Sequence, residues 1–309
     1  MQTNKTLSTF YVKTKENRMK TFTSRFKITP EKHVNLNDFQ TDYTSGMKKK
    51  AGEKELLKNI EELASIQELF WADNRYSLLI ILQAPDAAGK DGAIRHVMSG
   101  LNPQSCRVYS YKAPSKEELD HDYLWRHYKD LPERGMIGIF NRSHYENVLV
   151  TKVNPSFILN ENLPGINTEE DIDKKFWAQR YEQINHFEKH LVQNGTLILK
   201  FFLNISKEEQ KARLLARLQE EDKNWKFCSD DLKARAQWDD YHKAYEEMLE
   251  ETSTEHAPWF VIPADKKFFA RVAIGKIIVE KIKSLDLHYP TGETKEQLAN
   301  ALETLLGEQ

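Results

Sequence analysis

Four residues in one short segment, Asp86, Gly89, Lys90 and Asp91, could together bind a phosphate group. Backbone N–H groups at the start of a helix form a concave site for an anion, and a lysine beside them reaches phosphate oxygens. A carboxylate repels phosphate unless a divalent cation lies between the two groups. Because Mg²⁺ and Mn²⁺ prefer oxygen ligands, the segment predicts that Asp86 and Asp91 are metal ligands.

This segment departs from the common phosphate-loop pattern G-x-x-x-x-G-K-[ST] at two positions. Ala84 replaces the first glycine, and Asp91 replaces the hydroxyl residue that normally contacts magnesium. The apolar run Leu78–Gln83 before the loop and the helical pattern after it provide the strand–loop–helix context of a phosphate loop. A plain strand-to-helix turn with a surface lysine explains the same residues, so the segment alone leaves both interpretations open.

Polar residues also gather in the segment GIFNRSHYENVLV, which covers Gly138–Val150. Asn141, Arg142 and Glu146 follow an apolar run and are close together in the chain. Arg142 could neutralise an oxyanion through its planar guanidinium group. A helix cap at Asn141 with incidental charges would explain the start of a helix. It would not explain so many functional groups, which favour a site.

A third charged segment covers Ser206–Tyr245 and carries 9 Lys or Arg and 9 Asp or Glu. Arg213 and Arg217 are four residues apart on one helical face, and Lys223 and Lys226 follow. One interpretation is a balanced solvated surface. The other is a mobile lid whose cations close on phosphates and exclude water. We expect these arginines to be exposed and to add little stability, because exposed salt bridges contribute about 0–1 kcal/mol.

Five short apolar runs predict the strands that would position these groups. They are Leu78–Gln83, Arg107–Tyr111, Met136–Asn141, Thr196–Leu203 and Trp259–Pro263, of which the second has the weakest pattern. Helical patterns lie between them, with capping boxes expected at Ser115 and Ser206 and a long helix over Thr168–Asn194. This alternation predicts an α/β fold with a mostly parallel sheet and helices on both faces. Ligands of such sheets bind beyond the carboxyl ends of the strands.

We find no repeats and no Gly/Ser linker, so one α/β domain over residues 51–290 is expected, with a helix over Lys54–Ala72. A tail helix is expected within residues 291–309, and Trp259, Phe260 and Phe268–Phe269 are expected in the core. Residues 1–50 form a basic arm with 11 Lys or Arg against 4 Asp or Glu. The arm could be simply solvated, or it could help to capture a polyanion.

The composition excludes several classes of protein. The chain has 309 residues, 39% hydrophobic and 30% charged, and a net charge of −2, which argues against a general nucleic-acid binder. Its longest unbroken apolar run, Leu78–Leu82, is far shorter than the roughly 20 residues that span a bilayer. Cys106 and Cys228 lack metal-type spacing. We therefore expect a cytoplasmic protein with no nucleic-acid or membrane partner.

With these segments placed, the chain resembles the family-2 polyphosphate kinases, most of all their class III, from about Asp38 to about Tyr289. The resemblance rests on the ordered motifs DAAGKDG, GLNPQ, PSKEELDHDYLWRHY, GIFNRSHYENVLV, KNWKF and AYEEMLEETSTEHAPWFVIPAD. It implies a P-loop-kinase-like three-layer α/β/α fold with a five-stranded sheet and a helical lid over about 206–240. It also implies homodimers or homotetramers.

The function that this resemblance implies is Mg²⁺-dependent, reversible phosphoryl transfer from inorganic polyphosphate to nucleoside mono- and diphosphates: AMP, ADP, GMP and GDP. It implies catalytic roles for Asp86, Lys90, Asn141 and Arg142, nucleotide contacts for Asp122, Arg126 and Glu146, and metal binding by Asp86 and Asp91. It implies polyphosphate contacts for Lys90, Arg142, Arg213, Arg217, Lys223 and Lys226. Other subclasses have aspartate at the position of Asn141, so this residue either contacts metal or orients a water or the acceptor.

Two other functions are compatible with the same residues. One is an ATP-donating nucleotide or small-molecule kinase on the same scaffold, and the other is a non-catalytic module that binds polyanions. The first would consume ATP without polyphosphate, and the second would bind polyphosphate without producing ATP.

Overall fold

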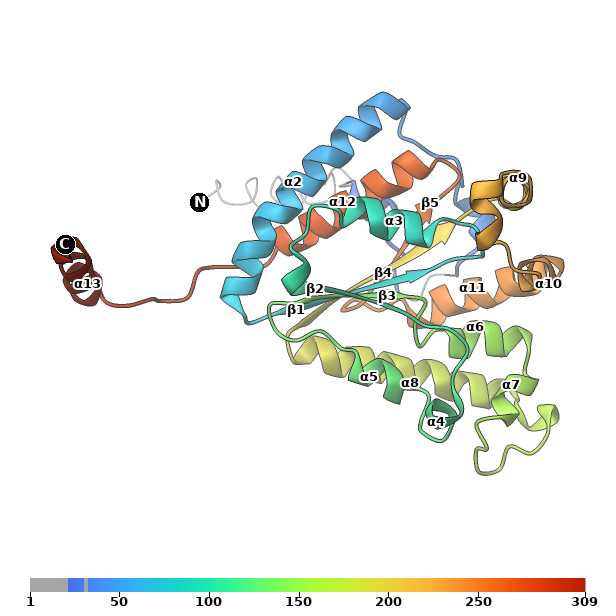
Figure 1. Ribbon diagram of the computed structural model, residues 1–309. Coiled ribbons are helices and arrows are strands. Elements are labelled where there is room, and N and C mark those ends of the chain that lie inside the picture. The colour runs from blue at the N-terminus through green and yellow to red at the C-terminus, as the bar shows by residue number, and fades with distance from the viewer. Residues whose placement is uncertain (1–21, 31–32, 309) are drawn as a thin grey trace, which may run out of the picture.

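The computed structural model describes residues 22–30 and 33–308, and its centre is a five-stranded parallel sheet (Figure 1). The strands are β1 (Ser77–Gln83), β2 (Cys106–Ser110), β3 (Ile137–Asn141), β4 (Thr196–Asn204) and β5 (Trp259–Pro263). Their order is β2-β3-β1-β4-β5, and every neighbouring pair is parallel. The five predicted strands and the parallel sheet are therefore confirmed.

Strand β1 shows why the sheet is covered on both faces. Leu78, Ile80 and Leu82 belong to one hydrophobic core, and Leu79 and Ile81 belong to the other. All five side chains are at most 1% exposed, so alternate residues of the strand are buried on opposite faces. A strand buried on both faces reads as a continuous apolar run, which is the pattern that the sequence has here.

Helices cover the two faces and complete the predicted three layers (Figure 1). One face carries α2 (Lys49–Asp73), α3 (Lys90–Val97) and α12 (Lys267–Lys283). The other carries α5 (Trp125–Lys129), α6 (Glu146–Val153), α8 (Lys174–Gln193) and α11 (Trp238–Thr252). Trp259, Phe260 and Phe269 are fully buried, which confirms them as core residues, and Phe268 is partly buried against the same core.

The lid and the tail extend from this body. The lid consists of α9 (Lys207–Gln219), the 3₁₀ turn η5 (Glu221–Lys226) and α10 (Asp230–Ala236), and it follows β4. It lies beyond the carboxyl ends of the strands (Figure 1). The tail helix α13 (Lys295–Gly307) lies apart from the body in the same view. The remaining short elements are α4 (Lys116–Leu119), α7 (Ser156–Leu159), η1 (Thr23–Arg25), η2 (Leu36–Asp38), η3 (Pro103–Ser105) and η4 (Glu169–Asp171).

The predicted start of the long helix is wrong by several residues. Thr168 opens the separate turn η4, where Asp171 accepts from the Thr168 backbone N–H. Helix α8 begins only at Lys174, because Asp173 accepts from the N–H of Phe176 and so caps the helix. The N-cap of the long helix is therefore Asp173, and Thr168 caps the short turn before it.

The capping box predicted at Ser115 is confirmed, but the one at Ser206 is only half present. Ser206 accepts from the N–H of Glu209, as expected. Its own N–H donates to Asp265, 2.8 Å away, and the Glu209 carboxylate pairs with Arg213 instead. The acidic residue of the expected box is thus used to hold the lid arginine.

In the described part of the basic arm, apolar residues pack on the domain, whereas Lys48, Lys49 and Lys50 are exposed. Phe26, Ile28 and Val34 are at most 4% exposed. The N–H of Ile28 donates to the carbonyl of Trp259, 2.9 Å away, and Lys27 forms an antiparallel bridge with Phe260. Residues 1–21 of the predicted arm lie outside the described residues. Within residues 22–30 and 33–308, none of the helices combines the length and apolar character that crossing a membrane requires.

His127 lies in the core beside strand β3. It is fully buried, and its ring contacts the ring of Tyr111 with centroids 4.2 Å apart. Within the described part of the chain, neither of its ring nitrogens has a hydrogen-bond partner. Burial lowers the pKa of His127 well below its ordinary value, so the folded protein holds this imidazole neutral.

Replacing His127 with Phe should weaken the loss of stability in mild acid. Below about pH 6.5 the unfolded chain binds a proton that the folded protein does not, so stability falls as pH falls. This residue contributes up to about 1.4 kcal/mol per pH unit to that loss. Denaturant unfolding at neutral pH and in mild acid measures the effect. An unchanged difference between the two pH values in His127→Phe would contradict the buried neutral imidazole.

Candidate active site

The loop between β1 and α3 has the backbone geometry of an anion site. Ala87 and Gly89 have positive φ values of 62° and 108°. Gly89 adopts this left-handed conformation without a Cβ penalty, and it stands directly before the first residue of α3. The turn directs backbone N–H groups into a concave space at the helix N-terminus, where the helix dipole favours negative charge. The strand, turn and helix that the motif requires are therefore all present.

Lys90 folds back over this loop. Its Nζ donates to the carbonyl of Ala84 at 2.9 Å, and among the described residues it has no carboxylate within 4 Å. Burial lowers the pKa of Lys90, and the neighbouring charge of Arg142 lowers it further. Lys90 is half-buried, and a partly desolvated cation without a carboxylate partner is an electrostatic site for a phosphate oxygen.

Arg142 connects the loop with the end of β3. Its Nη2 lies 3.0 Å from Oδ1 of Asp86, and its Nη1 lies 4.0 Å from Oε2 of Glu146. Glu146 raises the pKa of Arg142, burial opposes this change, and Asp86 adds to it. Arg142 has a φ of 62°, and its N–H donates to the carbonyl of Leu82 at 3.2 Å. The guanidinium group is thus held between the two predicted motifs.

Asn141 pairs with the second loop carboxylate. Its Nδ2 donates to Oδ1 of Asp91 at 2.7 Å, and its buried Oδ1 has no hydrogen-bond partner within the described residues. An aspartate at position 141 would repel Asp91, whereas the amide attracts it. The unpaired carbonyl oxygen of Asn141 is a hard ligand of the kind that divalent cations prefer.

The protein supplies only part of a metal coordination sphere. Asp86 is paired with Arg142, and Asp91 with Asn141. In residues 22–30 and 33–308, no group of three or more His, Cys, Asp or Glu is arranged to hold a metal ion. The oxygens of Asp86, Asp91 and Asn141 fit Mg²⁺ in type, and the substrate phosphates and water would have to complete the shell, as is usual for this ion.

A cavity of about 340 Å³ lies along α6 and reaches the loop through Arg142, which contacts Asp86. Its walls include Tyr111, Arg126, Arg142, Glu146, Asn147 and Phe157. Arg126 donates to Glu118 at 3.1 Å and lies 5.2 Å from the centre of the Tyr111 ring. The structure brings the predicted Arg126 and Glu146 into this cavity. It does not bring in Asp122, which is exposed and accepts from the N–H of Leu124.

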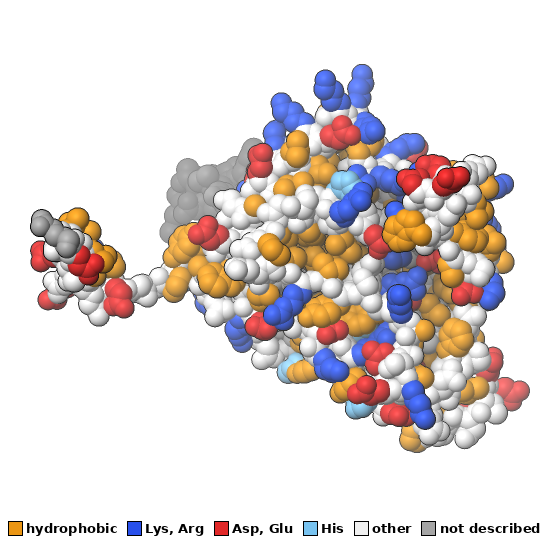
Figure 2. Space-filling model, in the orientation of Figure 1, with side chains coloured by type: hydrophobic (Ala, Val, Ile, Leu, Met, Phe, Trp, Pro, Cys, Tyr) orange, Lys and Arg blue, Asp and Glu red, His pale blue; other side chains and the backbone are white. Residues whose placement is uncertain are grey.

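A second cavity of about 250 Å³ is lined by the loop residues Ala87–Gly89 and lies between α3, the lid and α12. Its cations are Arg95, Arg213, Arg217, Lys223, Lys226, Lys267 and Arg271. On the face drawn in Figure 2, Lys and Arg side chains lie in the hollow beside the lid. We call this cavity the basic groove.

The basic groove contains positive charge that the protein does not neutralise. Burial lowers the pKa of both Lys267 and Arg271, and the nearby charge of Arg213 lowers both further. Arg95 also lowers the pKa of Arg271. Among the described residues, no carboxylate lies within 4 Å of Lys267, Arg271 or Arg95. Cations that repel one another and lack partners favour a bound polyanion.

Arg213 lines this groove but is not the exposed charge that we expected. It is 8% exposed, and its five N–H groups all have acceptors in the protein. These acceptors are the Glu209 carboxylate and the carbonyls of Ala87, Ala88, Ala264 and Asp265. The expectation that Arg213 is exposed is therefore wrong. Because it braces the lid helix against the phosphate loop and the end of β5, we now expect its loss to lower stability.

The other predicted lid cations also have partners within the lid. Arg217 donates to Asp231 at 2.8 Å, and Lys223 pairs with Glu220. The Nζ of Lys226 lies 5.0 Å from the centre of the Trp225 ring. The sequence analysis missed Arg95, Lys267 and Arg271. Helical spacing could have found them, since Arg95 is four residues after Asp91, and Lys267 and Arg271 are four apart just after β5.

Comparisons with known proteins agree with this geometry. The family model described as "Polyphosphate kinase 2 (PPK2)" matches residues 46–290. An "ADP-polyphosphate phosphotransferase" of Rhodopseudomonas palustris is 48% identical over 88% of this chain and 93% of its own length. An "AMP/ADP-polyphosphate phosphotransferase" of Meiothermus ruber is 42% identical over 87% of this chain and 96% of its own length.

A solved structure shares the fold. The crystal structure of polyphosphate kinase 2 from Arthrobacter aurescens superposes with a TM-score of 0.83 at 37% identity, and covers 92% of this chain and 96% of its own. The chain therefore belongs to the polyphosphate kinase 2 family.

Proposed function

We propose that this protein transfers the terminal phosphoryl group of inorganic polyphosphate to nucleoside mono- and diphosphates, converting AMP to ADP and ADP to ATP. The observation that carries the proposal is that the phosphate loop lines one cavity and is joined through the Asp86–Arg142 ion pair to a second, unlike cavity. One cavity is partly aromatic and suits a nucleotide, and the other is the basic groove. A group-transfer enzyme needs its donor and acceptor to meet at one point, and the loop is that point.

The cavity along α6 is the proposed acceptor site. Tyr111 and Phe157 offer aromatic surface for a base, whereas Arg126 and Arg142 offer cations for the acceptor phosphate. Aromatic surfaces stack on any base, so we include GMP and GDP among the acceptors. The relatives from R. palustris and M. ruber are named for ADP and for AMP and ADP, which supports both acceptors here.

The basic groove is the proposed donor site. Polyphosphate carries a dense row of negative charges, and the uncompensated cations Arg95, Lys267 and Arg271 match it. Arg217, Lys223 and Lys226 also line the groove. A polyanion can replace their partners within the lid, so they stay in the proposal. Arg213 acts there as a brace that keeps the groove next to the loop.

The reaction breaks the terminal P–O bond of polyphosphate and forms a new P–O bond to the terminal phosphate oxygen of the acceptor. Polyphosphate becomes one phosphate shorter, and the reverse step restores it. Lys90 and Arg142 neutralise the charge of the transferring group, and the protein needs no covalent step. Phosphotransferases of this kind generally need a divalent metal. We propose Mg²⁺, with Mn²⁺ as a substitute. Asp86 and Asp91 would hold this ion, and the ion would neutralise charge on the phosphates.

We also propose a cytoplasmic homodimer or homotetramer. Both cysteines are free thiols, which suits the reducing compartment where nucleotides are available. The assembly is what the family resemblance implies.

The function is tested by mixing the protein with Mg²⁺, AMP and polyphosphate and following ADP and ATP by chromatography. The proposal expects both products, in that order, only when polyphosphate is present. ATP consumption with no need for polyphosphate would instead identify an ATP-donating kinase. Tight polyphosphate binding without any product would identify a binding module.

Lys90→Ala should reduce the rate of phosphoryl transfer by about 10²-fold or more, because it removes a preorganised cation from the developing charge. The melting temperature should change little, since the side chain makes one hydrogen bond to a carbonyl. Lys189→Ala, at an exposed position of α8, is the matched control. Near-normal turnover of Lys90→Ala in steady-state assays would show that the loop is only structural.

Asp86→Asn should raise the Mg²⁺ concentration that gives half-maximal activity, because it removes a charged oxygen ligand. It also removes the ion pair with Arg142, so the maximal rate should fall as well. Magnesium titrations at saturating substrates separate the two effects. If the titration curves of variant and parent have the same midpoint, Asp86 does not bind the metal.

The double variant Lys267→Gln with Arg271→Gln should weaken the apparent affinity for long polyphosphate more than the affinity for AMP. Salt should inhibit the variant less than the parent, because fewer exposed attractive charges remain to be screened. Lys283→Gln, at the far end of the same helix, is the control for charge.

Arg213→Gln should behave differently from that double variant. It should lower the melting temperature, since four backbone carbonyls lose their donor.

Equal losses of AMP and polyphosphate affinity in Lys267→Gln with Arg271→Gln would contradict the donor role of the groove.

A further inference from the structure

A fully buried lysine and glutamate contact Tyr145, three residues after Arg142. Lys200 on β4 and Glu188 on α8 are both 0% exposed, and Lys200 Nζ lies 2.5 Å from Glu188 Oε2. We propose that this ion pair, acting through Tyr145, is a positioning device that fixes Arg142 and Glu146 for catalysis. The inference rests on the proposed function, because it takes Arg142 to act on the transferred phosphoryl group.

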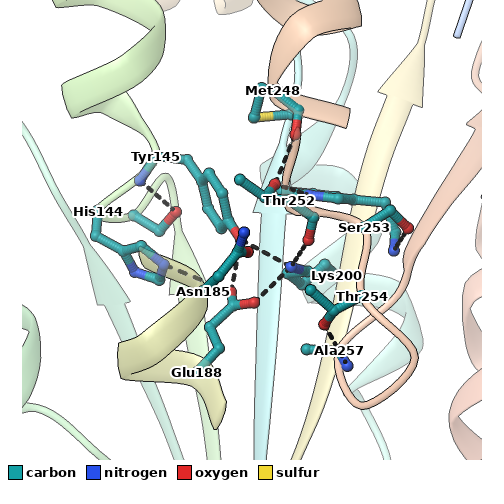
Figure 3. A network of polar contacts seen from close by, with 12 residues as sticks. His144, Tyr145, Asn185, Glu188, Lys200, Met248, Thr252, Ser253, Thr254 and Ala257 are labelled. Carbon is teal, nitrogen blue, oxygen red and sulfur yellow. Dashed lines mark hydrogen bonds and ion pairs between the residues drawn. The ribbon is translucent and has the colours of Figure 1, made fainter. Parts of the chain in front are cut away.

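Every polar side-chain atom of Lys200 and Glu188 makes a hydrogen bond (Figure 3). Lys200 Nζ donates to Glu188, to the hydroxyl of Tyr145 at 2.7 Å, and to the carbonyl of Thr252 at 2.8 Å. The Tyr145 hydroxyl donates to the other carboxylate oxygen of Glu188 at 2.6 Å. The Tyr145 hydroxyl is therefore hydrogen-bonded to both members of the ion pair, which fixes the position of the ring.

The ion pair is a poor choice if stability alone is needed. Burial by itself would raise the pKa of Glu188, but Lys200 and His144 hold it below its ordinary value, so the carboxylate stays charged. Burying two charges costs free energy that their attraction only partly returns, and apolar residues of similar volume are often as good or better. A directional contact, such as the one that holds Tyr145, is what an apolar pair could not supply.

The grip on Tyr145 is transmitted over a short, constrained segment. Tyr145 is the N-cap residue of α6, directly before Glu146 and three residues after Arg142. Arg142 has a φ of 62°, a conformation that a non-glycine residue keeps only where its surroundings impose it. On the other side, Gln83 donates to the Ser143 hydroxyl at 3.2 Å. Arg142 is thus fixed between an anchor on β1 and an anchor on β4 and α8.

A buried hydroxyl outside this network supplies the control. The Ser77 hydroxyl donates to the Thr196 hydroxyl at 3.0 Å. Ser77 is 4% exposed and lies at the amino end of β1, the end opposite the phosphate loop and the segment 141–146. Removing it tests what a general loss of buried hydrogen bonds does.

The test compares Tyr145→Phe with Ser77→Ala, each of which removes one buried hydroxyl. Both variants should lower the melting temperature. Tyr145→Phe alone should reduce kcat, by about tenfold, and raise KM for AMP, because bound substrates would meet a misplaced Arg142. KM for polyphosphate should stay nearly unchanged, since Arg142 does not line the basic groove. Equal kcat losses in the two variants, or no kcat loss in Tyr145→Phe, would overturn the proposal.

A second variant separates position from stability. Lys200→Met combined with Glu188→Leu replaces the ion pair by apolar side chains and should keep or raise the melting temperature. Its kcat should still fall, because Tyr145 loses both partners. A stable double variant with parental kcat would overturn the proposal.

Hydrogen exchange gives a readout that does not depend on activity. Amides of residues 141–150 should exchange faster in Tyr145→Phe than in the parent, and Ser77→Ala should leave them unchanged. If the parent makes no ADP from polyphosphate, the proposed function fails, yet the exchange comparison still decides whether the ion pair holds this segment. Unchanged exchange in Tyr145→Phe would overturn that role.

Discussion

The contact between Arg142 and Asp86 is the interaction on which the rest of the site depends. It joins the loop after β1 to the turn after β3, two segments that are adjacent only because the strands pair in parallel with Leu82 opposite Asn141. The carboxyl ends of parallel strands meet at one edge of a sheet, so a cation and an anion from distant parts of the chain can form one phosphate site. Without this register the loop would be a turn with a lysine.

Around that contact, the protein separates two kinds of recognition. On the α6 side, arginines stand beside aromatic surface, which suits a nucleotide. On the α12 side, seven cations line the groove, and three of them, Arg95, Lys267 and Arg271, have no carboxylate within 4 Å among the described residues, which suits a polyanion. Arg213 holds the lid to the loop through backbone carbonyls, so the two sides keep a fixed relation to Lys90. In this chain the loop departs from the usual phosphate-loop pattern by having Asp91 at the position where a hydroxyl residue normally contacts magnesium.

Much of the fold could be predicted from the sequence, because strands buried on both faces read as apolar runs and caps and glycines mark the helix ends. The partners of charged side chains could not. Arg142 and Asp86 are 56 residues apart, and the carbonyls that Arg213 contacts in the loop are 125 and 126 residues away from it. Helical spacing placed Arg213 and Arg217 on one face but not against a neighbour. Lys200, inside the apolar run LILKFFL, was a visible signal, since a buried lysine needs a partner.

The central claim is that donor and acceptor occupy separate cavities at the same time and that the phosphoryl group passes directly between them. Initial rates measured while AMP and polyphosphate are both varied test this claim most directly. Direct transfer in a ternary complex predicts double-reciprocal lines that intersect. Parallel lines would contradict it, because they would mean that the protein first takes the phosphoryl group covalently and releases the shortened donor before AMP reacts.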